Sequence, residues 1–219
     1  MSKRDGLHPL RRSHSLRPSP DQWRFFRQWL KNPLAIAAIS PSSHHLARQM
    51  VAELPSGARR VIELGGGTGV FTQALIEHGI AAPDLLVLEL NEELHRHLQA
   101  RFPDARVICG DARELPAIVA LSGYAEGGPA DAVVSGLGLL SMNRTMQQGI
   151  LEAVFAVLRA DGRFIQFTYG PRSPVNREVL AELGLHVRRA SMTLRNMPPA
   201  TVYVYTRQRS RAIRPTPMR

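Results

Sequence analysis

A chain of 219 residues is long enough to bury one sizeable core and to carry additional segments. With 44% hydrophobic and 21% charged residues, its composition is that of a globular protein and excludes general disorder. The charge balance is unusual, because 28 Lys and Arg against 18 Asp and Glu give a formal net charge of +10. Such a basic chain favours an anionic partner: a nucleic acid, an anionic membrane surface or a phosphate-bearing substrate.

The sequence also limits the compartment and the relation to a membrane. Cys109 is the one cysteine of the chain, so an internal disulfide is impossible, which fits a reducing cytosol. The first residues are basic but lack the apolar stretch of a signal peptide. No run approaches the ~18 apolar residues of a spanning helix. We therefore expect a cytoplasmic protein that meets the inner face of the membrane only peripherally.

The N-terminal region predicts a basic arm followed by two helices. Residues 1–18 carry five basic residues against one acid and are expected to be disordered. A capping-box pattern at residues 19–22 opens a helix whose apolar stripe includes Trp23, Phe26 and Trp29. This stripe can lie in a membrane interface or pack on the protein's own core. Ser40-Pro41 opens a second helix, expected to run to about residue 54.

From residue 60 onward, short apolar runs alternate with helical patterns. Strands are expected at 61–64, 85–90, 105–109, 132–135, 163–169, 185–194 and 201–206. Helices are expected at 70–77, 92–101, 113–121, 142–159 and 176–183. The alternation predicts a doubly wound α/β fold, and the last two strands, with no helix between them, predict an antiparallel hairpin at one edge. We thus expect a Rossmann-like, seven-stranded, mostly parallel sheet preceded by N-terminal helices.

These patterns also divide the chain. Residues 1–58 are expected to form the basic arm and the N-terminal amphipathic and lid helices. Residues 59–206 are expected to form the catalytic domain, and residues 207–219 a second basic segment with five arginines and no acid.

A glycine-rich turn carries the strongest functional signal. The segment from Val61 to Gly69 reads VIELGGGTG and stands between an expected strand and an expected helix, where nucleotide-binding turns occur. Glu89 follows Gly69 by twenty residues, at the end of the next strand, where a carboxylate can accept hydrogen bonds from both ribose hydroxyls. A dinucleotide fingerprint starting at Gly65 needs glycine at position 70, which is Val70. The form G-x-G-x-G is instead that of S-adenosylmethionine-dependent methyltransferases.

The third expected strand ends at Gly110-Asp111-Ala112. The Asp111 carboxylate can meet the exocyclic amine of adenine, can cap the following helix, or can do both. Cys109 beside it is expected to be a buried small residue, and no residue pattern suggests a metal. The expected cofactor contacts are Glu63, Gly65, Gly67, Gly69, Glu89, Leu90, Asp111, Ala112 and Ser135.

The chain resembles bacterial phospholipid N-methyltransferases, which convert phosphatidylethanolamine to phosphatidylcholine. The resemblance spans roughly residues 22–206. It rests on FFRQWLKNP (25–33), ISPSS (39–43), the glycine turn, VVSGL (133–137), QFTYGPRSP (166–174), and Arg195-Asn196 with Pro198-Pro199. Gly66 and Gly138 depart from the family pattern, which has proline at both positions, but neither position needs a side chain for chemistry. The resemblance implies an ethanolamine phospholipid substrate and its mono- and dimethyl derivatives.

Four further residues are candidates for contacts with substrate. Tyr169, at the end of the strand after the long helix, is expected to orient the lipid amine and to hold the methylated ammonium by cation–π attraction, or else to pack at the edge of the sheet. Arg172 is a candidate for the lipid phosphate or a solvated loop charge. The resemblance suggests that Ser42 and Ser43 close over the cofactor, although they can also cap the second helix.

Two other functions fit parts of the pattern. An RNA adenine methyltransferase would explain the charge, but such enzymes carry Asn-Pro-Pro-Tyr or Asp-Pro-Pro-Tyr after the fourth strand. Here that place reads SGLGLL (135–140), with no amide, carboxylate or aromatic ring. A non-catalytic membrane-binding protein with a relict nucleotide pocket is the third interpretation, against which Glu89 and Asp111 argue. A nucleic acid partner is therefore less favoured than a lipid, and no protein partner is implied.

Overall fold

The structure is a computed structural model that describes residues 41–169, 172–193 and 199–208. Its centre is a seven-stranded sheet in the order β3-β2-β1-β4-β5-β7-β6. Strands β1 to β5 pair in parallel, whereas β7 runs antiparallel to both β5 and β6. The strands are Val61–Leu64 (β1), Leu85–Glu89 (β2), Arg106–Cys109 (β3), Ala130–Ser135 (β4), Leu158–Tyr169 (β5), Leu185–Thr193 (β6) and Ala200–Arg207 (β7).

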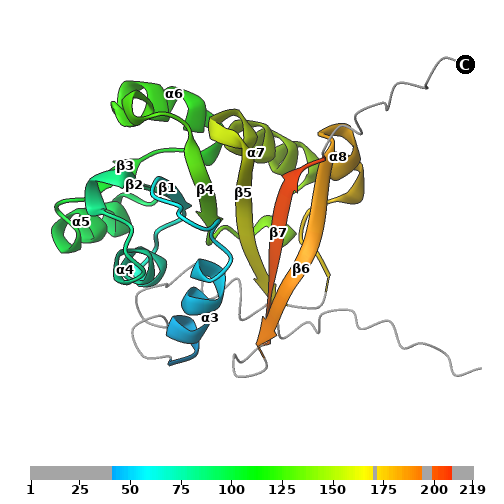
Figure 1. Cartoon of the computed structure of the whole chain (residues 1–219), viewed down its shortest axis with the longest axis horizontal. Coiled ribbons are helices and arrows are strands. Elements are labelled where there is room, and N and C mark those ends of the chain that lie inside the picture. Colours follow the sequence, from blue (N-terminus) through cyan, green and yellow to red (C-terminus); the bar gives the residue numbers. More distant parts are fainter. Residues whose placement is uncertain (1–40, 170–171, 194–198, 209–219) are drawn as a thin grey trace, which may run out of the picture.

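Two layers of helices cover the sheet (Figure 1). One face carries α3 (Pro41–Val51), α4 (Val70–Glu77) and α5 (Glu92–Arg101), and the other carries α6 (Leu115–Leu121), α7 (Arg144–Val157) and α8 (Arg177–Glu182). Since β1, β2 and β4 are buried on both faces, they are largely apolar and do not alternate between apolar and polar residues. The Rossmann-like fold and the antiparallel C-terminal strands are as the sequence predicts.

Helix α3 is the described part of the N-terminal region. It begins at Pro41, as predicted, but ends at Val51 rather than near residue 54. Leu46, Ala47 and Met50 lie on one side of it and are almost fully buried with residues of α4 and the sheet. The helix expected before it, with Trp23, Phe26 and Trp29, lies outside the described residues. The division of the chain at residue 58 stays a prediction.

The junction of α7 and β5 differs from the prediction. Helix α7 begins at Arg144, because the Asn143 side chain caps it by accepting from Met146 N at 2.9 Å. It ends at Val157, and β5 already begins at Leu158, which pairs with Ala130. The expected stop at Asp161-Gly162 lies inside β5, where the pairing with β4 shifts register. An added Cβ at Gly162 would lie 3.0 Å from Arg159 O and from Leu158 Cδ2, so a larger residue needs these neighbours to shift.

Smaller differences concern the ends of elements. The segment expected as one helix at 113–121 is a 3-10 turn at Ala112–Glu114 followed by α6. Strand β4 starts two residues earlier than predicted, and β7 extends one residue further at each end. Helices α4 and α5 and strand β1 match the prediction residue for residue.

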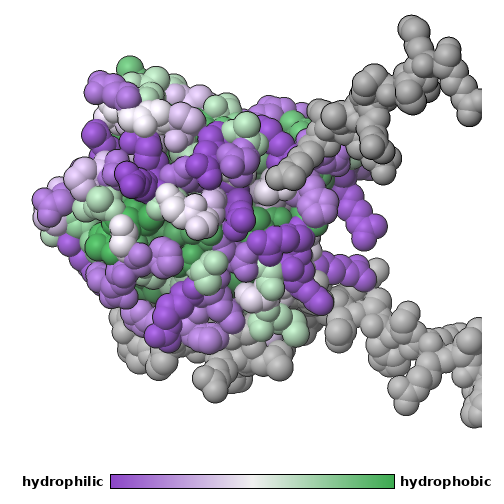
Figure 2. Space-filling model, in the orientation of Figure 1, coloured by the Kyte–Doolittle hydropathy of each residue, from purple (hydrophilic) through white to green (hydrophobic). Residues whose placement is uncertain are grey.

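The surface carries both polar and apolar areas. Hydrophilic residues cover most of the face seen in Figure 2, and hydrophobic residues gather between the positions of α6 and α4, where the two helical layers part. Among the described helices, none combines the length and hydropathy needed to cross a bilayer.

Candidate functional site

The glycine turn lies at the carboxyl ends of the central parallel strands, where open α/β sheets bind ligands. Gly65 N donates to Leu88 O at 2.7 Å, which ties the turn to the end of β2. Gly67 has a φ of +55°, and an added Cβ there would meet no atom within 4 Å. The turn therefore leaves its outer side open for a ligand to approach the backbone.

Gly66 has a packing role that the sequence did not reveal. An added Cβ at this position would lie 2.5 Å from Val87 Cγ1 and 2.8 Å from Leu98 Cδ1. A larger residue, including the proline expected from the family pattern, needs these neighbours to move. Because Gly66 has no side chain, the turn can pack closely against β2 and α5.

Glu89 fixes the turn from the neighbouring strand. Its Oε2 accepts from Gly67 N at 2.9 Å, and its Oε1 accepts from Asn91 N at 2.9 Å. Both bonds lock the carboxylate in place at the edge of the turn, where it is 8% exposed. A carboxylate has about four acceptor positions, so two remain for ribose hydroxyls.

Glu63 lies beneath the turn, in the middle of β1, and is completely buried. Thr72 of α4 donates its hydroxyl to Glu63 Oε2 at 2.6 Å, whereas Oε1 has no partner among the described residues. The pKa of Glu63 is raised to about 8, chiefly by burial and to a smaller extent by the nearby Glu89, while the hydrogen bond from Thr72 offsets part of the rise. The unpaired, buried oxygen is the observation that best supports a polar ligand at the turn.

The segment after β4 closes the other side of the turn. Ser135 is fully buried, and its Oγ accepts from Leu137 N at 3.2 Å. Gly136 N donates to Leu64 O at 2.8 Å. An added Cβ at Gly136 would approach Gly65 O to 2.9 Å, so this glycine allows the two segments to touch. Ser135 thus lies next to the glycine turn, and its contact with the cofactor stays a prediction.

Phe71, Phe167 and Tyr169 form an aromatic row that begins near the contact between Gly136 and Gly65. Phe71 of α4 lies 5.7 Å from Phe167, and Phe167 packs edge-on against Tyr169 at 5.5 Å, with an interplanar angle of 82°. Tyr169 is half-buried at the last residue of β5, and burial raises its pKa, so its phenol stays neutral at physiological pH. Tyr169 thus packs against Phe167 on an inner strand of the sheet, and its contact with the lipid amine stays a prediction.

Asp111 has the capping role considered for it. Its Oδ1 accepts from Arg113 N at 2.9 Å, and the Arg113 guanidinium reaches Oδ2 at 2.6 Å. This guanidinium holds the pKa of Asp111 below its usual range. A contact between Asp111 and adenine must therefore share the carboxylate with Arg113. The neighbouring Leu90 is 68% exposed and Ala112 is buried.

The prediction that Cys109 is buried is wrong. Cys109 is exposed, because it ends β3, the strand at the edge of the sheet. Its thiol donates to Leu90 O at 3.7 Å.

The remaining candidates are less constrained. Arg172 is exposed. The backbone of Ser42 and Ser43 lies in the first turn of α3, but their side chains are outside what the structure describes. In the described ranges, no group of three or more His, Cys, Asp or Glu side chains is placed to hold a metal ion.

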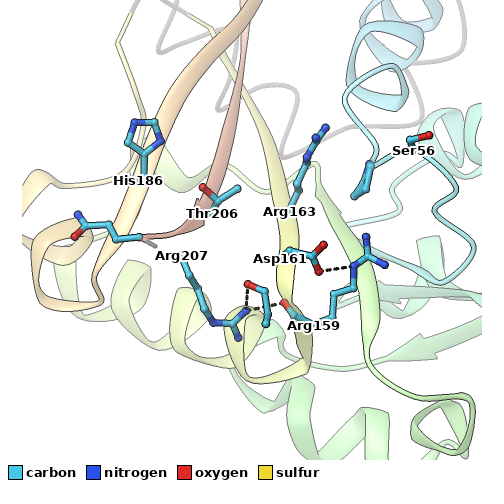
Figure 3. A pocket seen from close by; sticks show the side chains of 10 residues that line it. Ser56, Arg159, Asp161, Arg163, His186, Thr206 and Arg207 are labelled. Carbon is cyan, nitrogen blue, oxygen red and sulfur yellow. Dashed lines mark hydrogen bonds and ion pairs between the residues drawn. The ribbon is translucent and has the colours of Figure 1, made fainter. Parts of the chain in front are cut away.

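A hollow of about 970 Å³ lies on the far side of the sheet from the glycine turn, at the amino ends of the parallel strands, where β5 begins and β7 ends (Figure 3). Its arginines have structural partners. Arg207 donates to Arg159 O at 2.7 Å and to Leu158 O at 3.3 Å, which satisfies carbonyls just after α7. Arg159 pairs with Asp131 at 2.8 Å and with Asp161 at 2.9 Å. The basic hollow is thus separate from the glycine turn.

The described residues fit S-adenosylmethionine. Glu89 offers acceptors for a ribose, Gly67 leaves open space beside its backbone, and Glu63 keeps a buried oxygen without a described partner. A family model described as "Methyltransferase domain" matches residues 61–162. The crystal structure of the glycopeptide N-methyltransferase MtfA with S-adenosylmethionine has a TM-score of 0.57 at 13% identity, covering 76% of this chain and 94% of that one.

Fold, site and sequence similarity define a class I S-adenosylmethionine-dependent methyltransferase, and the chain belongs to that family. The chain is similar to the ornithine lipid N-methyltransferase of Singulisphaera acidiphila, with 35% identity over 155 residues, 69% of this chain and 79% of that protein. The ribosomal RNA small subunit methyltransferase A of a Synechococcus species is 34% identical over 99 residues, 42% of this chain and 31% of that protein.

Sequence reasoning missed two polar residues at this edge of the sheet. Thr72 binds Glu63, and Gln166 of β5 is fully buried beside Ser135. A signal for Gln166 was present, because it interrupts the apolar run of a strand expected to be buried on both faces. Thr72 has no comparable signal, since its importance depends on α4 packing over β1.

Gly67→Ala tests whether the turn binds the cofactor. Gly184→Ala is the matched control, because Gly184 has a φ of +58° and open space but lies between α8 and β6, away from the turn. Both variants should lose roughly 1–2 kcal/mol of unfolding free energy from left-handed strain. We expect that only Gly67→Ala weakens binding of S-adenosylhomocysteine, by about tenfold or more, in isothermal titration calorimetry. Equal affinities in the two variants would place the cofactor elsewhere.

Proposed function

We propose that this methyltransferase N-methylates the amine headgroup of a membrane lipid, and that the headgroup is phosphatidylethanolamine or its mono- and dimethyl derivatives. The similarity to an ornithine lipid N-methyltransferase over 79% of that protein's length carries the proposal of a lipid amine. The phosphatidylethanolamine headgroup rests on the sequence segments at 25–43 and 166–174.

The chemistry needs a neutral amine beside the cofactor. When bound, S-adenosylmethionine supplies an electrophilic methyl group on a sulfonium. An alkylammonium has no lone pair, so the amine must first lose a proton. Burial beside a positive charge lowers the pKa of the amine and favours that loss. The aromatic row supports such a site, because Phe167 and Tyr169 exclude water and the ring of Tyr169 can attract a methylated ammonium.

In this proposal Tyr169 also orients the amine through its hydroxyl, and Arg172 binds the lipid phosphate. Most of the rate enhancement comes from holding the amine in place, since methyl transfer to a neutral amine needs little further chemistry from the protein.

An RNA substrate is the second candidate, supported by the ribosomal RNA methyltransferase similarity and by the net charge of +10. Against it, Ser135, Gly136 and Leu137 occupy the position where base-methylating enzymes carry an amide or carboxylate and an aromatic ring. The test offers labelled S-adenosylmethionine with phosphatidylethanolamine, ornithine lipid or total RNA to the purified full-length protein. Label in a lipid supports the proposal, and label in RNA alone refutes it.

We further propose that residues 1–31 bring the protein to anionic membranes. This segment has eight basic residues against Asp5 and Asp21, a local net charge of +6, and it holds both tryptophans of the chain. Each basic residue near an anionic surface contributes about 1 kcal/mol, which salt screens, whereas buried tryptophan does not depend on salt.

The double variant Trp23→Ala with Trp29→Ala should therefore bind anionic vesicles at least about tenfold more weakly, even at low salt, in a sedimentation assay. High salt should weaken binding of the wild type without abolishing it. Cofactor affinity is the control and should not change, since Glu89 lies in the sheet. Wild-type sedimentation of the double variant would mean that the tryptophans do not contact the membrane.

A further inference from the structure

Gln166 combines complete burial with an unused hydrogen-bond acceptor. Its Nε2 donates to Leu137 O at 2.9 Å and to Phe167 O at 2.6 Å. Both partners are carbonyl oxygens, so turning the amide over would set oxygen against oxygen. Its Oε1 has no hydrogen-bond partner among the described residues. A buried acceptor without a hydrogen bond lowers the stability of the folded protein by about 1–3 kcal/mol, unless a ligand or water donates to it.

A second buried glutamine on the same face shows the contrast. Gln147 of α7 donates to Leu139 O at 2.8 Å and to Pro174 O at 3.1 Å, and its Oε1 accepts from Asn176 N at 2.8 Å. Both ends of Gln147 are thus used to hold loops in place. Gln166 holds a loop with its nitrogen only, which leaves its oxygen available to another group.

Gln166 lies close to the edge of the sheet where the glycine turn is. It is level with Ser135 in the pairing of β4 with β5, at the ligand-binding edge of the sheet. Leu137, to which it donates, lies 3.0 Å from the place where a Cβ of Gly65 would be. Leu137 therefore lies between Gln166 and the glycine turn and contacts both. Thr168, two residues further along β5, adds another buried polar side chain on the same face.

We propose that Gln166 Oε1 binds the N–H of the substrate amine and thereby supplies, from β5, the amide acceptor that is missing at Ser135. The inference rests on the proposed methylation of an amine. It carries a consequence for specificity. A neutral primary or secondary amine has an N–H to donate, whereas a neutral tertiary amine has none. Gln166 therefore favours the first and second methylations over the third.

The experiment compares the wild type, Gln166→Leu and the control Gln147→Leu on phosphatidylethanolamine and on its N,N-dimethyl derivative, in mixed micelles. Losing one strong hydrogen bond should lower kcat/KM of Gln166→Leu for phosphatidylethanolamine about tenfold or more. For the dimethyl lipid, the loss should stay below about threefold. Gln147→Leu should lower both rates by the same factor, because it loosens loops without contacting the amine.

Equal losses of Gln166→Leu on both lipids would overturn the proposal and leave Gln166 as a brace for Leu137. If the wild type methylates neither lipid, the proposed function itself fails. If the wild type methylates both lipids and Gln166→Leu loses equally on both, only the inference about Gln166 fails. Gln166→Met, which keeps the length of the side chain but has no amide, gives a second measurement should the leucine variant not fold. It should show the same unequal losses on the two lipids. Equal losses of Gln166→Met on both lipids would also overturn the proposal.

Discussion

Glu89→Ala should lose cofactor affinity by about 100-fold or more. The substitution removes the acceptors proposed for two ribose hydroxyls, and charged hydrogen bonds of this kind contribute roughly 1.5–3 kcal/mol each. It also removes the bonds to Gly67 N and Asn91 N that set the shape of the turn. Titration calorimetry with S-adenosylhomocysteine measures the loss directly.

Two further variants sharpen this prediction. Glu89→Gln should also bind weakly, because its amide would have to point an NH₂ group at a backbone donor. Glu92→Ala, in the exposed first turn of α5, is the control and should bind as the wild type does. Affinity within about threefold of the wild type in Glu89→Ala would remove Glu89 from the site.

The buried Glu63 should make stability fall as pH rises. Its folded pKa of about 8 lies above the ordinary value of 4.5, so between these values the folded chain holds a proton that the unfolded chain releases. Folding is therefore favoured at the lower pH, and this contribution is lost as pH rises toward 8. Since one pKa unit corresponds to about 1.4 kcal/mol, the expected loss is on the order of a few kcal/mol.

Glu63→Gln isolates this effect, because it keeps the shape of the side chain but cannot titrate. Urea unfolding of both proteins from pH 5 to pH 9 should show a steeper decline for the wild type than for the variant. Glu93→Gln, on the exposed side of α5, serves as the control and should follow the wild type. Parallel curves for the wild type and Glu63→Gln would mean that Glu63 is already charged in the folded protein.

The elements that the sequence predicts best are those with local signals. Helix α5 has an asparagine cap, two acids in its first turn and an apolar spacing that places Leu94 and Leu98 inside. The glycine turn and Glu89 were identifiable for the same reason, since a strand, a turn and an acid at the next strand end form a pattern in one dimension.

The features that could not be predicted depend on residues distant in the chain. The end of α7 looks like a stop at Asp161-Gly162, but Arg207 of β7 donates to carbonyls at Leu158 and Arg159, and the strand begins there instead. The exposure of Cys109 follows from the position of β3 at the edge of the sheet, which the order of elements along the chain does not reveal.

The residues of the candidate site also differ in how far the sequence predicts their roles. The requirement for glycine at position 66 depends on Val87 and Leu98, two side chains that reach the turn only after folding. The unused oxygen of Gln166 is visible only once Leu137 O and Phe167 O are known to take its hydrogens. Sequence patterns thus identified the candidate cofactor turn, whereas the proposed amine contact depends on the packing of β5 against the segment after β4.

The central claim is that this basic methyltransferase acts on a lipid nitrogen. Its most direct test is to incubate the full-length protein with methyl-labelled S-adenosylmethionine and bacterial membrane lipids, and to locate the label by tandem mass spectrometry of the headgroups. We predict label on the nitrogen of an amine headgroup, with phosphatidylethanolamine converted to its N-methyl derivatives, and none with Glu89→Ala. Label confined to RNA, or lipid label on a carbon or oxygen atom, would contradict the account.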